Sequence, residues 1–218
     1  MLDAHPSLPF KQTISDRVPV ISPYVIGRDV LDLGCVDARL QKHSAEQRDQ
    51  YKVNLLHKRL AELNPNIVGA DIDPDGCRVL NAQGYNVLCE NVETMNLGRL
   101  FDTIVAGELI EHLENPGLFL RNMHRHLKPG GVIIISTPNP FYAGSGWKIW
   151  RHHKPAVHED HMGWQDPITL DQLLRRTGYD PIEGYWVQPK PAIFKTWKRL
   201  LRGYFSHTFL RIARKREG

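Results

Sequence analysis

Short apolar runs that alternate with longer amphipathic segments are the feature that most limits the fold of this chain. The clearest run, VIIIST at Val132–Thr137, is polar only at its last two positions. Strands of this kind are buried on both faces, as in parallel sheets covered by helices. The pattern therefore predicts an α/β fold with a doubly wound, mostly parallel sheet and helices on both faces. The expected strands are Asp29–Leu33, Asn66–Ile72, Tyr85–Cys89, Phe101–Ala106 and Val132–Thr137, with Pro181–Gln188 as a candidate sixth.

The segments between these runs carry the signals of helices. Pro116–Leu127 starts with a proline and is followed by Pro-Gly-Gly, which is the usual punctuation of a helix. Other helices are expected within 38–63, at Asp75–Gln83 and at Thr169–Thr177. The length of 218 residues suits one such domain with appendages. We divide the chain into a lead-in at 1–28, a domain at 29–190 and a C-terminal tail at 191–218.

The charge of the chain is concentrated near its end. Eight Lys and Arg and no acidic residue lie between Lys195 and Arg216, so the net charge of +4 leaves about −4 on the rest. A nucleic-acid footprint over the whole body is therefore not expected. The three cysteines lack CxxC spacing, and no run of 18 apolar residues or signal-peptide layout is present, which predicts a cytoplasmic protein.

Polar residues follow the predicted strands at the edge where such sheets bind ligands. Gly34 allows the backbone to approach a ligand closely. The carboxylate of Asp71 can accept both hydroxyls of a ribose, and Glu90 and Asn91 can read an adenine. A dinucleotide loop needs two further glycines, but those positions hold other residues, beginning with Val36. The pattern favours a nucleoside cofactor without a pyrophosphate, and it makes an NAD-dependent oxidoreductase the weakest alternative.

Five motifs, taken in order, resemble those of Rossmann-like S-adenosylmethionine (SAM) methyltransferases. The resemblance covers roughly residues 28–188 and implies SAM as the cofactor. It implies that Asp32 and Gly34 lie near the methionine part of SAM, and that Asp71, with Ile72 beside it, binds the ribose. Asn91 or Glu90 would lie at the adenine, and Glu108 would complete the cofactor site. The DxGxGxG loop of the family is reduced here, with Val36 and Ala38 in place of glycines. The motifs are Asp32-Leu-Gly-Cys35, Gly69-Ala-Asp71, Phe101-Asp102, Glu108-Leu-Ile-Glu-His112 and Leu127-Lys-Pro-Gly-Gly131.

Two carboxylates and an imidazole form a candidate catalytic cluster. Glu108, Glu111 and His112 have the spacing i, i+3 and i+4, which places them on one face of a helical turn. Such a set suits Mg²⁺, Mn²⁺ or Zn²⁺. The ExxEH segment resembles the metal motif of the ubiquinone-biosynthesis O-methyltransferases and of the small-RNA 2′-O-methyltransferases, which add a later histidine. Here that residue is His161, with His158 as a neighbour. Without a metal, His112 would serve as a general base.

Two further regions bear on the acceptor. The segment after the fifth predicted strand is rich in aromatic residues that either stack on an acceptor or, for at least half of them, form a small core; they are Phe141, Tyr142, Trp147, Trp150 and Trp164. In the tail, apolar residues from Trp197 to Phe205 recur at helical spacing among basic residues. This helix either docks on the body or contacts the inner face of a membrane.

These observations predict a SAM-dependent methyltransferase with Glu111, His112 and His161 as its catalytic residues. The first choice of acceptor is oxygen on a small-molecule, sugar or lipid-linked compound. The alternatives are a metal-dependent RNA 2′-O-methyltransferase, with nucleic acid the less favoured partner, and a non-catalytic SAM-fold binding protein.

Overall fold

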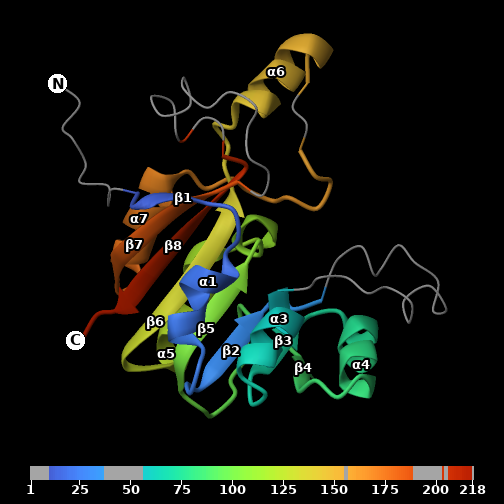
Figure 1. The fold of residues 1–218 in the computed structure, drawn as a ribbon, viewed down its shortest axis with the longest axis vertical. Helices are drawn as coiled ribbons and strands as arrows, with labels where there is room; N and C mark the ends of the chain where they lie inside the picture. The colour runs from blue at the N-terminus through green and yellow to red at the C-terminus, as the bar shows by residue number, and fades with distance from the viewer. Residues whose placement is uncertain (1–9, 37–55, 155–156, 189–202, 204–205, 218) are drawn as a thin grey trace.

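The computed structural model describes residues 10–36, 56–154, 157–188, 203 and 206–217. In this part of the chain eight strands form one sheet in the order β1-β7-β8-β6-β5-β2-β3-β4 (Figure 1). Every pairing between neighbours is parallel except those of β8, so the prediction of a mostly parallel α/β sheet is confirmed. The strands are β1 Gln12–Ile14, β2 Val30–Leu33, β3 Val68–Asp71, β4 Val87–Cys89, β5 Phe101–Gly107, β6 Leu127–Pro138, β7 Tyr179–Val187 and β8 Thr208–Lys215.

The strand order reverses between β2 and β5. From β2 the chain adds β3 and β4 on one side, and it then returns to place β5 and β6 on the other side. Crevices at the carboxyl ends of the strands on either side of such a switch point are where open α/β sheets bind ligands. Two glycines flank the switch point: Gly34 directly follows β2, and Gly107 is the last residue of β5.

Helices cover both faces of the sheet, as the apolar strands require. Alternate residues of β6 enter different cores: Ile133 and Ile135 pack in the larger one, and Val132 and Ile134 pack in the other. The larger core also contains residues of α5 (Pro116–His126) and α7 (Pro167–Arg176). The opposite core contains residues of α1 and α3, which lie on the near face in Figure 1; these are Val18–Ile21 and Leu56–Leu63.

Three helices begin where the sequence carries a capping residue followed by proline. Asp73 accepts a hydrogen bond from the backbone of Asp75 at the start of α4 (Pro74–Ala82), and Asn115 and Asp166 cap α5 and α7 in the same way. These side chains satisfy backbone N–H groups that have no partner within the helix. The predicted helices at these positions are therefore confirmed, and no boundary differs by more than two residues.

The end of the chain corrects the prediction of a separate tail. Thr208–Lys215 form β8, which pairs antiparallel with both β6 and β7 inside the sheet. Phe209, Leu210 and Ile212 are fully buried there. Phe209–Ala213 are buried without interruption, and Arg211 within this run gives the segment the basic character of a tail. The predicted amphipathic helix from Trp197 to Phe205 lies outside the described residues, apart from Gly203.

The lead-in is also part of the folded body. β1 pairs with β7, and Ile21 and Val25 are buried in the core that contains α3. Asn64 reinforces this contact, because its side-chain amide donates to the carbonyl oxygen of Val25 at 2.9 Å. The α1 helix continues into a single 3₁₀ turn at Ser22–Tyr24.

The aromatic segment after β6 contains a helix, α6 (Ala143–His152), that has no buried residue. Trp147 and Trp150 are 64% and 67% exposed, and Phe141 and Trp164 are exposed as well. The expectation that at least half of these aromatic side chains form a small core is therefore wrong. The sequence of α6 has no clear helical periodicity, because two glycines precede bulky apolar residues in it, so the exposure of its tryptophans was not predicted. No helix in the described ranges has the length and apolar character to cross a membrane.

Candidate functional site

A cavity of about 300 Å³ lies at the switch point of the sheet. It is bounded by the residues that follow β2, β3 and β4 and by the turn after β5. Of the predicted cofactor residues, Gly34, Asp71, Ile72 and Asn91 line it, as does Glu90. The other lining residues are Val92, Glu93, Leu109, His112, Leu113 and Glu114.

The turn after β2 is shaped by Gly34. Its φ of +65° is a left-handed conformation that side chains disfavour. A Cβ at this position would come within 3.1 Å of Cδ1 of Leu109, which forms the facing wall of the cavity. Gly34 thus combines a tight turn with close approach of the backbone to the cavity.

Val36, which replaces a glycine of the family loop, does not line the cavity. It packs toward α4, where a Cβ on Gly76 would come 2.2 Å from Cγ1 of Val36. The absence of a side chain at Gly76 therefore accommodates the one at Val36. Ala38, the other departure from the loop pattern, lies outside the described residues.

Asp71 is held in place at the end of β3 by backbone donors. Its Oδ2 accepts from the amide of Val36 at 2.8 Å, and its Oδ1 accepts from the amide of Asp73 at 3.0 Å. Burial raises the pKa of this carboxyl, and the two backbone hydrogen bonds oppose the rise. The carbonyl of Asp71 also accepts from Glu90, so the ribose and adenine candidates are joined through adjacent strand ends.

Two predicted cofactor residues do not line this cavity. Asp32 is 2% exposed and accepts from Nδ1 of His57 at 2.9 Å, beneath the turn. Glu108 follows β5 with a φ of +54°, and its Oε1 accepts from Nη1 of Arg17 at 3.1 Å. The same Arg17 nitrogen donates to Oγ of Ser136 at 2.6 Å. Burial raises the pKa of Glu108, and the charge of Arg17 opposes that rise.

Glu111, His112 and His161 come together beside the cavity. The side-chain atoms that these residues offer lie within 4.8 Å of one another. Glu111 and His112 belong to a 3₁₀ turn, Ile110–His112, and Glu108 precedes it. The expected single helical face with Glu108 is therefore not formed, because the left-handed backbone of Glu108 breaks the helical spacing.

Contacts from outside the turn fix the members of this cluster. Oγ1 of Thr137, at the end of β6, donates to Oε2 of Glu111 at 2.9 Å. Nδ1 of His112 lies 3.1 Å from the carbonyl oxygen of Asp160 and donates to it, which leaves Nε2 of the neutral ring as an acceptor or ligand. The backbone amide of Met162 donates to the carbonyl of Glu111 at 2.8 Å and brings the segment of His161 to the site.

The pKa values of Glu111 and His161 are both shifted toward the uncharged forms of these side chains. Burial, with a smaller contribution from the charge of Glu108, raises the pKa of Glu111 to about 8. Burial together with the neighbouring His112 and His158 lowers the pKa of His161. The rings of His112 and His161 are 4.8 Å apart between centroids. A carboxylic acid and a neutral imidazole are thus favoured near neutral pH, and a divalent ion would displace the proton of Glu111.

Sequence reasoning missed three residues that shape the site. Thr137 is the last residue of a predicted strand, so inspection of the strand ends themselves, besides the residues after them, would have found it. Leu109 separates the two acidic residues of the ExxEH motif and faces Gly34. Arg17 lies 91 positions from Glu108, and no local pattern connects the two.

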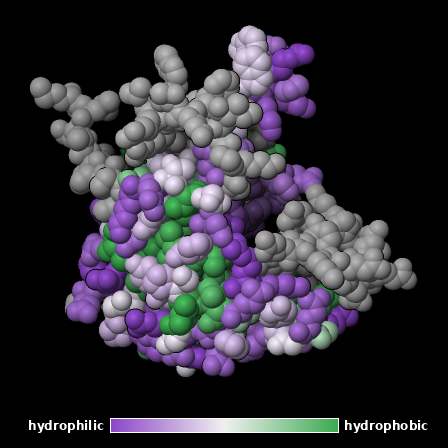
Figure 2. Space-filling model, viewed as in Figure 1, coloured by the Kyte–Doolittle hydropathy of each residue, from purple (hydrophilic) through white to green (hydrophobic). Residues whose placement is uncertain are grey.

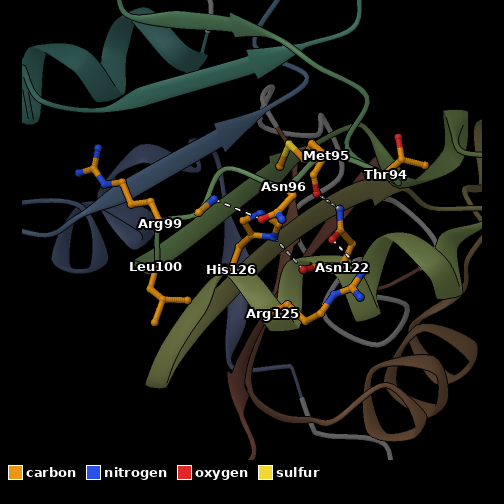
Figure 3. A pocket seen from close by; sticks show the side chains of 9 residues that line it. Thr94, Met95, Asn96, Arg99, Leu100, Asn122, Arg125 and His126 are labelled. Carbon is orange, nitrogen blue, oxygen red and sulfur yellow. Dashed lines mark hydrogen bonds between the residues drawn. The ribbon is translucent and has the colours of Figure 1, made fainter.

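A second cavity, of about 410 Å³, shares no lining residue with the first (Figure 3). It lies between the 94–100 segment and α5. The buried amide of Asn122 donates to the carbonyls of Val92 and Met95 at 3.0 Å each, and Nε2 of His126 accepts from the amide of Leu97 at 3.1 Å. These side chains hold the 94–100 segment against α5, and their hydrogen-bonding groups named here are already occupied by backbone partners.

The fold and the cavity at its switch point suit a methyltransferase, and comparison with known proteins gives the same class. A family model described as a methyltransferase domain matches residues 11–183. The chain therefore belongs to this methyltransferase domain family.

Curated relatives and solved structures are consistent with that family. A ubiquinone biosynthesis O-methyltransferase of Cereibacter sphaeroides is 32% identical over 146 residues, which are 59% of this chain and 57% of that protein. One from Rickettsia conorii is 27% identical over 205 residues, 84% of this chain and 65% of that protein. The chain therefore spans less than two thirds of these relatives. A SAM-dependent methyltransferase from Archaeoglobus fulgidus has the same fold, with a TM-score of 0.65 at 19% identity and 91% coverage of both chains.

Proposed function

We propose that this chain transfers the methyl group of SAM to an oxygen atom of a small-molecule acceptor. The observation that carries the proposal is the position of His112. This residue lines the cofactor cavity and also belongs to the cluster with Glu111 and His161. A single side chain therefore connects the candidate cofactor site to a candidate acid–base or metal site.

The cavity residues supply the contacts that a nucleoside requires. Asp71 presents a carboxylate whose two oxygens each retain an acceptor position for a ribose hydroxyl. Glu90 and Asn91 lie at the next strand end, where an adenine would sit, and Gly34 leaves room for the methionine part. SAM, when bound, supplies an electrophilic methyl group on a sulfonium. Asp32, which is buried with His57, would act by positioning the turn.

The cluster has the donors for a divalent ion. One carboxylate and two imidazoles suit Mn²⁺ or Zn²⁺ and, with added water, Mg²⁺. Glu111, His112 and His161 would hold the ion, whereas Glu108 is engaged by Arg17. Such an ion, when bound, lowers the pKa of an acceptor hydroxyl and orients it. In the absence of an ion, Nε2 of His112 would take the hydroxyl proton.

The acceptor is proposed to be a hydroxylated ring compound, and a lipid-linked one is the preferred form. The support is that the relatives are ubiquinone biosynthesis O-methyltransferases. Trp164 is 40% exposed and lies two residues after Met162, whose amide donates to the carbonyl of Glu111, so it offers apolar surface for such a compound. The proposed membrane contact of the tail is limited to the residues before Thr208, because Thr208–Lys215 form β8 between two other strands of the sheet.

The first test is a calorimetric titration with S-adenosylhomocysteine, with NAD⁺ as the control ligand. Micromolar binding is expected for the wild type, and its loss is expected in Asp71→Ala. Asp180→Ala, which removes an exposed carboxyl on β7, is the matched control. Binding that survives in Asp71→Ala would contradict the assignment of the cavity.

The second test concerns the cluster. Release of S-adenosylhomocysteine is followed with a catechol as the acceptor, after treatment with a chelator and after addition of Mn²⁺, Mg²⁺ or Zn²⁺. His161→Ala is expected to abolish any metal-dependent gain, and His152→Ala on the exposed α6 is the control. If turnover is unchanged by the chelator and by added metal but is lost in His112→Ala, His112 acts as a general base without a metal ion.

A further inference from the structure

Two of the three cysteines lie together at the edge of the sheet, next to the cofactor cavity. Cys77 is buried on α4, whereas Cys89 is the last residue of β4 and is exposed. Cys77 packs with Val87 in a small core beneath α4. Because side chains two positions apart in a strand point to the same face, Cys89 lies on the same face of the sheet as Val87. Both thiols therefore lie between α4 and the end of β4.

The two thiols differ in their access to solvent. The outward side of α4 is mostly hydrophilic, with Asp75 and Arg78 exposed on it (Figure 2). Cys77 faces inward from this helix and is 3% exposed. Burial, followed by the charge of Asp71, raises the pKa of Cys77 to about 12. A dissolved oxidant therefore meets Cys89 first, while Cys77 stays a protonated thiol behind it.

Backbone carbonyls at the strand ends bring the two sulfur atoms together. Sγ of Cys77 lies 3.5 Å from the carbonyl oxygen of Leu88 and 3.6 Å from that of Asp71, and it can donate its proton to either. Leu88 is bonded to Cys89, so the buried sulfur lies beside the backbone of the second cysteine. Sγ of Cys89 lies 3.9 Å from the carbonyl oxygen of Ile72. The two thiols thus contact consecutive carbonyls, and the side chains are near enough to hydrogen-bond to each other.

The carbonyls that these thiols contact belong to the candidate cofactor site. Asp71 and Ile72 line the cavity, and so does Glu90, which directly follows Cys89. The amide of Glu90 donates to the carbonyl of Asp71 at 2.8 Å, so the carbonyl that faces Cys77 also holds the adenine end of the site. A bond between the two sulfur atoms would draw Cys77 away from this carbonyl and pull the end of β4 toward α4.

We propose that Cys77 and Cys89 are a reversible oxidation site, and that their disulfide weakens the binding of a nucleoside in the cavity. A peroxide is the oxidant. The thiolate of Cys89 attacks one peroxide oxygen, the O–O bond breaks, and hydroxide leaves, which makes a sulfenic acid. Sγ of Cys77 then attacks the sulfenic sulfur, the S–O bond breaks, and the proton of Cys77 leaves with the oxygen as water. Two thiols and one hydrogen peroxide thus become one disulfide and two waters, and a dithiol reverses the reaction by exchange.

The test treats the reduced full chain with hydrogen peroxide, alkylates the remaining thiols and maps the peptides by mass spectrometry. A disulfide between Cys77 and Cys89 of one chain is expected. Cys35 is the internal control and should stay reduced, because it is buried and burial raises its pKa. In Cys77→Ser, oxidation should stop at a sulfenic acid on Cys89 that dimedone traps, and in Cys89→Ser neither product should form. A reduced wild type after treatment, a link to Cys35 or a bond between two chains would overturn the proposal.

Titration of the reduced and oxidised chains with S-adenosylhomocysteine measures the effect on the cavity, and this part rests on the proposed function. Oxidation should weaken binding by about tenfold, as for the loss of one hydrogen bond, and dithiothreitol should restore it. Peroxide should leave the affinity of Cys89→Ser unchanged, which controls for oxidation elsewhere in the chain. Equal affinities of the reduced and disulfide-linked forms would overturn the proposed effect. If the reduced chain does not bind either, the cofactor assignment fails with that effect, whereas the peptide map decides the disulfide independently.

Discussion

Substitution of Glu111 by glutamine isolates the energetic cost of the buried carboxyl in the site. Burial and the charge of Glu108 raise the pKa of Glu111 from its ordinary value of 4.5 to about 8. Between these values the folded protein binds more protons at this residue than the unfolded chain does. The free energy of unfolding of the metal-free protein should therefore fall as pH rises through this window.

The structure sets the size of the effect. The full difference between pKa 4.5 and about 8 corresponds to an upper limit of roughly 5 kcal/mol at pH 8. Relaxation around the ionised group reduces this, and we expect about 2–3 kcal/mol. Glu111→Gln keeps an acceptor for Thr137 but never ionises. The variant should match the wild type near pH 5 and become the more stable of the two toward pH 8.

Urea unfolding from pH 5 to 9 in the presence of a chelator measures this difference. Glu62→Gln, on the exposed face of α3, controls for the removal of one negative charge. A difference between Glu111→Gln and the wild type that does not change with pH would refute the reasoning. If the cluster binds Mn²⁺, the ion should restore stability at pH 8 to the wild type and not to the variant.

Three further perturbations follow from packing. Gly34→Ala should cost about 1–2 kcal/mol of stability for its left-handed backbone and should weaken binding of S-adenosylhomocysteine, as calorimetry would show. Gly76→Ala should destabilise the protein in thermal unfolding, and addition of Val36→Ala should recover most of the loss; purely additive effects would contradict the contact. Asp171→Ala should cost about 3–5 kcal/mol because it leaves the fully buried Arg211 charged, and Asp171→Leu/Arg211→Met should cost less. Equal losses for that single and double change would count against a buried ion pair.

Local sequence was sufficient for much of the fold and part of the site. Strands such as β5 and β6 contain the apolar runs Ile104–Ala106 and Val132–Ile135, and helices such as α7 carry a capping residue and a proline at their start. The order of these elements determines a doubly wound sheet, and that sheet brings Asp71 and Asn91 to one edge. These features depend on side chains close in sequence, so patterns in the sequence predict them.

Contacts between distant segments decided the remainder. β8 occupies the interior of the sheet although its sequence is basic, because Asp171 on α7 pairs with the charge of Arg211. Val36 fits because Gly76 on α4 has no side chain, and Glu108 departs from the cluster because it meets Arg17. Each of these outcomes depends on a partner far along the chain, whose proximity exists only after the sheet has formed. Sequence alone therefore determined which edge carries the site, and tertiary packing decided which side chains face it.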